Sequence, residues 1–100
     1  MHSAEAYNMP SLFEMLGYRV FFWSNENNEP IHVHISKGVP SANSAKVWLT
    51  KRGECLIADN GIHIPEKDLA KLMDAISAQY FLIYARWKEH FAVDTIHFYC

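Results

Sequence analysis

The chain has 100 residues, of which 50% are hydrophobic and 14% aromatic, and its formal net charge is −2 at pH 7. These values are typical of one folded domain with one core, and they exclude a disordered acidic or basic tail. So small a charge does not favour nucleic-acid binding through net charge, and the sequence shows neither a membrane span nor a signal peptide. We therefore expect a cytoplasmic protein that does not contact a membrane.

Three regions are expected along the chain. The polar residues 1–8 predict a flexible extension, residues 9–91 a single α+β domain, and residues 92–100 a C-terminal tail with the pattern of a short edge strand. At the start of the domain, Ser11–Leu16 predicts one short helical turn that Gly17 ends.

The middle of the chain predicts four strands joined by tight turns. The expected strands are Tyr18–Ser24, Ile31–Ser36, Ala45–Thr50 and Glu54–Ala58. The first is rich in β-forming residues and apolar on both faces, which predicts a central position in the sheet. The second and third alternate apolar with more polar residues, which predicts one buried and one wetter face. Because turn residues connect the strands in sequence, we expect a mainly antiparallel meander.

A helical segment follows the strands. From Pro65 to Phe91 the apolar residues recur at helical spacing, which predicts one helix or two. Within it, Tyr80–Ala85 is apolar all round, so either the helix breaks near Ser77–Gln79 or Phe81 and Leu82 contact a partner chain. The expected fold class is α+β, with a four-stranded, mainly antiparallel sheet and the helical segment packed on one face.

Two histidines lie on the second predicted strand, in the stretch EPIHVHI. Side chains two residues apart on a strand project to the same face, so His32 and His34 present their imidazoles together. A transition metal such as Zn²⁺ would need a third ligand. Candidates for it are Glu26, Glu29, Asp59, His63, Asp94 and His97, of which we favour Glu29 and His63. The bland alternative is two solvated or hydrogen-bonded histidines on an open sheet face, with no cofactor.

Acid–base chemistry is the third interpretation of the two histidines. In a small ribonuclease, one imidazole accepts a proton from a 2′-hydroxyl while another group donates one to the leaving oxygen. Such an enzyme needs a cation for the phosphate, and Arg19 is our candidate, with Lys46, Lys51 and Arg52 as further basic residues. RNA would then be the substrate, whereas DNA binding is not expected because the helical segment begins with acidic residues.

The chain also contains five stretches that occur together in one family. They are Met9–Leu12, Gly17–Ser24, Glu29–Ile35, Lys46–Leu49 and Pro65–Ile76. In this combination the chain resembles the short prokaryotic family that is catalogued as a domain of unknown function and numbered forty-one sixty. The Pro-x-His-x-His pattern is the most specific part of the resemblance, which extends from Met9 to about Phe91.

The resemblance implies no established activity. It does imply a genetic setting, because genes of this family often lie beside the gene of another small uncharacterised domain, and the pair is suspected of being a toxin–antitoxin-like module. Our first hypothesis is a small intracellular binding module that contacts a protein partner, or a second copy of itself, through Phe81, Leu82 and the C-terminal tail. The alternative is a ribonuclease or metal-dependent hydrolase that uses the face of His32 and His34.

Overall fold

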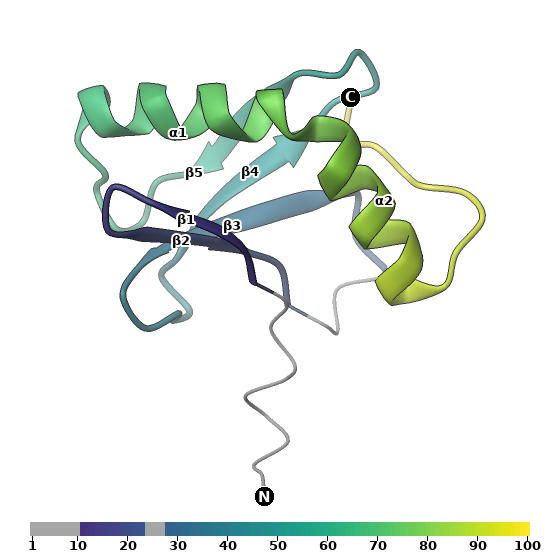
Figure 1. The fold of residues 1–100 in the computed structure, drawn as a ribbon, viewed down its shortest axis with the longest axis horizontal. Coiled ribbons are helices and arrows are strands. Elements are labelled where there is room, and N and C mark those ends of the chain that lie inside the picture. The colour runs from purple at the N-terminus through teal and green to yellow at the C-terminus, as the bar shows by residue number, and fades with distance from the viewer. Residues whose placement is uncertain (1–10, 24–27) are drawn as a thin grey trace, which may run out of the picture.

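The computed structural model describes residues 11–23 and 28–100, and it shows an antiparallel sheet followed by two helices (Figure 1). The elements are β1 (Ser11–Met15), β2 (Tyr18–Phe21), β3 (His32–Lys37), β4 (Ala45–Leu49), β5 (Cys55–Asp59), α1 (Glu66–Ala78) and α2 (Tyr80–Phe91). The strands pair in sequence order, β1-β2-β3-β4-β5, as a meander. The α+β class is confirmed, whereas the expected number of four strands was one too few. The predicted extension over residues 1–8 lies outside the described residues.

The additional strand is β1, where the sequence analysis predicted a helical turn. Met15 and Tyr18 are register partners in an antiparallel pair, so only Leu16 and Gly17 form the hairpin turn. Both turn residues have positive φ, 56° for Leu16 and 81° for Gly17, as a type I′ turn requires. Such a turn matches the twist of the two strands. Pairing with β2 therefore makes this segment a strand, although its local sequence pattern favours a helix.

The face of the sheet beneath the helices forms one side of the core. Register partners share a face, which places Val20 with Ile35 and Val33 with Val47 on this side. These residues belong to one buried cluster with side chains from both helices. The helical contribution to that cluster includes Leu72, Ile76, Tyr80, Ile83 and Trp87. Each of the fully buried aliphatic side chains contributes roughly 1.5–3 kcal/mol, which is ample to hold both helices on the sheet.

The helical segment breaks at Gln79, as one of the two alternatives predicted. Gln79 has φ −106° and ψ 18°, and it separates α1 from α2. The change of direction points the side chain of Tyr80 toward the end of the sheet, where its hydroxyl donates a hydrogen bond to the Thr50 carbonyl. Phe81 and Leu82 nevertheless stay exposed on the other side of α2. Neither helix is of the length and apolarity that crossing a membrane would require.

The C-terminal tail is not an edge strand, which corrects the expectation for residues 92–100. From the end of α2 it returns toward the β4–β5 turn (Figure 1). The amide of Ile31 donates to the His97 carbonyl at 2.9 Å, and the amide of Lys51 donates to the Cys100 carbonyl at 2.9 Å. The ring of Tyr99 stacks on Trp48 with 4.8 Å between the centroids. The tail therefore crosses the ends of β3 and β4 and binds its own domain.

Replacing Tyr80 with phenylalanine tests the connection between α2 and the sheet. Tyr80→Phe should lower the free energy of unfolding by about 1–2 kcal/mol, because the buried Thr50 carbonyl loses its side-chain donor while the ring is kept. Burial raises the pKa of the Tyr80 phenol above its ordinary value, and the neighbouring Tyr84 adds to the rise. The hydroxyl therefore stays a donor through neutral pH, and its contribution is lost only as pH rises through that raised pKa.

Urea unfolding monitored by circular dichroism measures this difference. Tyr99→Phe is the matched control, since it removes the same atom from an exposed ring that keeps its stack on Trp48. We expect the control to unfold with the wild-type midpoint. Equal stability of Tyr80→Phe and the wild type at pH 7 would show that the hydrogen bond does not stabilise the junction.

Candidate functional site

His32, His34 and Arg19 lie on the face of the sheet that is opposite the core residues of β2 and β3. His32 and His34 alternate with the core residues of β3, and His34 is the register partner of Phe21 on β2 and of Lys46 on β4. The prediction that both imidazoles share a face is therefore confirmed. The alternative of solvated or hydrogen-bonded histidines on an open face agrees with the structure in part. The face is not open, because His32 is 0% and His34 only 8% exposed, but His32 is hydrogen-bonded.

His32 is enclosed by aromatic rings. Its Nδ1 lies 2.8 Å from the Pro30 carbonyl oxygen, so the imidazole is bonded to the chain just before β3. The ring centroid lies 5.7 Å from that of Trp48 on β4 and 5.4 Å from that of Trp87 on α2. His32 thus packs where the end of the sheet meets α2, and its complete burial excludes it from direct contact with a dissolved substrate.

His34 lies beside His32 but nearer to the surface. The two imidazole centroids are 4.9 Å apart, and the His34 ring stacks on Phe21 at 5.5 Å. Trp23 meets the Phe21 ring in an edge-to-face arrangement, with 5.1 Å between centroids, and lies 6.3 Å from the His34 ring. The pair is therefore part of an aromatic layer, and only His34 retains a small exposed area.

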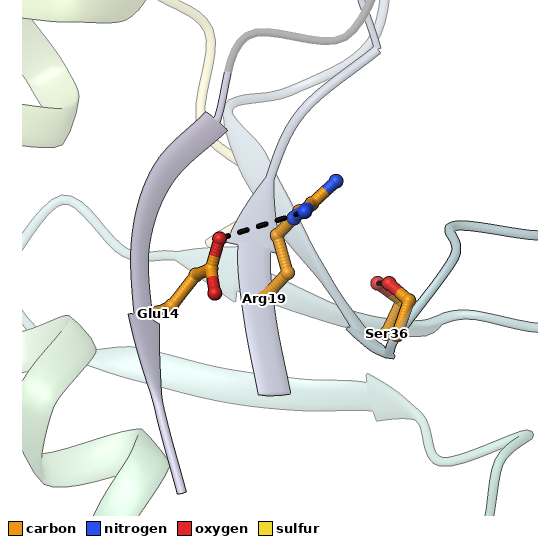
Figure 2. Close-up of polar contacts among 4 residues, drawn as sticks. Glu14, Arg19 and Ser36 are labelled. Atoms are coloured by element: carbon orange, nitrogen blue, oxygen red, sulfur yellow. Dashed lines mark hydrogen bonds and ion pairs between the residues drawn. The ribbon is translucent and has the colours of Figure 1, made fainter. Parts of the chain in front are cut away.

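Arg19, the candidate phosphate-binding cation, is engaged in an ion pair. Its guanidinium lies 3.5 Å from the Glu14 carboxylate across the β1–β2 pair, as Figure 2 shows. Ser36, its register partner on β3, lies on the same side of the sheet, and the Ser36 hydroxyl donates to the Gly38 carbonyl at 3.3 Å. The guanidinium of Arg19, on the same face as His34, is therefore already paired with a carboxylate.

Lys46, the second basic residue of this face, is held in the same way. Its ammonium lies 2.6 Å from the Glu29 carboxylate and 4.3 Å from the centre of the Trp48 ring. An ion pair reinforced by a cation–π contact leaves little attraction for a further anion. Both cations beside the histidines are thus neutralised, which weakens the site as a receptor for phosphate.

The two favoured third ligands for a metal do not join the histidines. Glu29 is engaged by Lys46, and His63 is exposed in the β5–α1 loop, where its backbone has φ 55°. Over residues 11–23 and 28–100, no three histidine, cysteine or acidic side chains lie close enough together to hold a metal ion. Among the described residues, His32 and His34 therefore have no third potential metal ligand beside them.

A second surface is formed where α2 meets the β4–β5 turn, and the sequence predicted only half of it. Phe81 is 79% and Leu82 49% exposed at the start of α2, although both are large apolar side chains. Lys51 and Arg52 are exposed on the turn, which the Tyr80 hydrogen bond joins to this end of α2. We call these four residues the α2–turn surface. The apolar run over Tyr80–Ala85 indicated its helical part, but no local pattern indicated that the basic turn lies next to it.

The comparisons with known proteins place the chain in a family without assigning an activity. The family model described as "Domain of unknown function (DUF4160)" matches residues 17–88, which include both the histidine face and the α2–turn surface. Searches of curated proteins and of solved structures found no match. The chain therefore belongs to the DUF4160 family of domains of unknown function.

Proposed function

We propose that this protein is a small cytoplasmic binding module that acts through a protein partner, in a toxin–antitoxin-like pair with the product of a neighbouring gene. One observation carries the proposal, namely the exposure of Phe81 and Leu82 side by side on α2. Apolar side chains grouped on a surface mark interaction sites more often than isolated ones do. Docking a partner there would remove both from water, at roughly 1.5–3 kcal/mol for each side chain.

The exposure does not result from a poorly packed helix. The same helix buries Tyr80, Ile83 and Trp87, which face the sheet and its end. Phe81 and Leu82 therefore point outward because α2 is correctly seated on the core. A helix that presents apolar residues on both sides has one face for its own domain and one for a partner.

Lys51 and Arg52 define the charge that the partner should carry. The two exposed cations lie on the turn that Tyr80 holds against α2. Charges at the rim of an interface select partners and accelerate association more than they add affinity. The α2–turn surface thus favours a segment that is apolar at its centre and acidic at its edge.

Catalysis on the histidine face is the second candidate. The 4.9 Å separation of the two imidazole centroids favours it, since His32 and His34 are close enough to act together. Against it stand the burial of both rings and the pairing of Arg19 and Lys46 with carboxylates. The geometry therefore supports the binding module better than the ribonuclease or metal-dependent hydrolase.

Co-expression with the product of the adjacent gene tests the binding module. The wild-type chain should copurify with that product in a stoichiometric complex, and the double variant Phe81→Asp with Leu82→Asp should lose it. Aspartate in the first turn of α2 suits the helix dipole, so the variant should keep its fold. Size-exclusion chromatography with light scattering measures the complex, and circular dichroism checks the fold.

Val39→Asp is the control for that experiment, because Val39 is an 85% exposed apolar residue in the β3–β4 loop. It should leave the complex intact. A complex that survives the double substitution, or the absence of any complex, would contradict the proposal. Self-association that only the Phe81 and Leu82 substitutions abolish would identify a second copy of this chain as the occupant instead.

Alanine variants of the two histidines separate the structural interpretation from the catalytic one. His32→Ala should lower the free energy of unfolding by about 2 kcal/mol or more, because it leaves a cavity among Trp48 and Trp87 and an unpaired Pro30 carbonyl. His34→Ala, at the edge of the layer, should cost less. Thermal unfolding, RNA cleavage and metal content are measured on the same samples. RNA cleavage or bound metal that both folded variants lose would establish the catalytic alternative.

A further inference from the structure

A cavity of about 480 Å³ lies within the α2–turn surface. Its walls come from three segments that are far apart in the sequence. They are the turn Lys51–Gly53, the helical residues Tyr80, Phe81 and Tyr84, and Phe98 from the C-terminal tail. Its volume falls in the range of small-ligand pockets, roughly 300–1,000 Å³, and is therefore ample for one aromatic side chain.

The aromatic wall of this cavity is held in place by its own contacts. The ring of Tyr84 lies near-parallel to that of Tyr80, at 24° and 6.4 Å, and to that of Phe98, at 21° and 6.3 Å. The Tyr80 hydroxyl bonds the Thr50 carbonyl, while the amide of Lys51 bonds the Cys100 carbonyl. Turn, helix and tail are thus joined around the cavity, so a ligand would find the site already formed.

The charged side chains that line this cavity are all positive. Lys51 and Arg52 line it, and no carboxylate does among the described residues. The neighbouring cavities differ in this respect. One of about 440 Å³ shares Lys51 and Arg52 with it and adds Glu54, and one of about 620 Å³ includes Glu89 and Asp94 beside Lys88. Of these three cavities, only the aromatic one is lined by cations without a carboxylate.

We infer that this cavity receives an aromatic side chain from an acidic segment of the protein partner, and that carboxylates flanking that side chain bind Lys51 and Arg52. The inference rests on the proposed function and names the chemistry of the segment that the surface selects. An aromatic anchor enclosed in a pocket and surrounded by a polar rim is the usual centre of an interface. The four aromatic residues supply the pocket, and the two turn residues supply the rim.

Single-stranded nucleic acid fits the same cavity less well. Single strands are bound along a basic groove that follows several phosphates, whereas among the described residues only Lys51 and Arg52 supply positive charge to the cavity lining. Phe81 is the one strongly exposed ring of the four, and its neighbour Leu82 offers nothing to a base or a phosphate. The formal net charge of −2 is also unlike the basic footprint of a nucleic-acid-binding domain.

Three defined probes test the inference by two-dimensional NMR titration of the purified chain. The first is a capped six-residue peptide with a central phenylalanine flanked by aspartates, and the second replaces every aspartate with asparagine. The third is a six-nucleotide oligouridine. The acidic peptide should shift the resonances of Arg52, Phe81 and Tyr84, and the amide peptide should bind about tenfold more weakly, since two exposed ion pairs are lost.

Matched charge variants then locate the binding. Lys51→Gln with Arg52→Gln should weaken the acidic peptide about tenfold and leave the amide peptide unchanged. Lys67→Gln with Lys71→Gln makes the same change of net charge on exposed residues of α1 and should leave both peptides unchanged. Equal effects of the two variant pairs, or no shift at Phe81 and Tyr84, would overturn the inference.

The remaining outcomes separate this inference from the proposed function. Oligouridine that binds the cavity more tightly than the acidic peptide would replace the protein segment by nucleic acid as its occupant. If the peptide binds at the cavity but no complex forms with the neighbouring gene product, the inference about an acidic aromatic segment stands and the proposed partner is wrong. A complex that depends on Phe81 and Leu82, combined with peptides that do not bind, would retain the module and reject the acidic aromatic anchor.

Discussion

The hydrogen bond from the Tyr80 hydroxyl to the Thr50 carbonyl fixes the junction of the two helices against the end of the sheet. It connects the break between the helices with the end of β4, at the start of the β4–β5 turn. Since the helical segment changes direction at Gln79, α2 can cover the end of the sheet instead of continuing along the line of α1 (Figure 1). The same bond brings the basic turn next to the exposed start of α2. Together with the bond from the Lys51 amide to the Cys100 carbonyl, this contact positions the α2–turn surface and its cavity.

The histidine face shows how a polar pattern in a strand can serve packing. His32 donates a hydrogen bond to the Pro30 carbonyl and packs against Trp48 and Trp87. Its imidazole is therefore a hydrogen-bonded side chain of the core. Its ring stays in place because strand, helix and preceding turn all contact it. A Pro-x-His-x-His pattern of this kind keeps the beginning of β3 fixed against α2. Specificity of a motif within a family thus does not by itself distinguish a binding residue from a structural one.

Much of the sheet could be predicted from alternation alone, because β3 and β4 each place one row of apolar residues toward the helices. The strand β1 could not, since its turn requires a left-handed conformation at Leu16, a residue type that gives no such signal. Burial of His32 and His34 escaped prediction because the rings that cover them, Trp48 and Trp87 on His32 and Phe21 on His34, come from other segments of the chain. The tail was misread because its backbone hydrogen bonds to Ile31 and Lys51 leave no pattern in side-chain types.

The apolar stretch over Tyr80–Ala85 predicts either a helix break or exposed apolar residues on α2, and the structure contains both. The break rotates Tyr80 and Ile83 toward the core, which leaves Phe81 and Leu82 on the outside of α2. An uninterrupted helix would have had to place this apolar run with α1 over the same part of the sheet. The break therefore exposes Phe81 and Leu82 and does not bury them. In this fold, the feature that completes the core also leaves apolar side chains exposed on the outer side of α2.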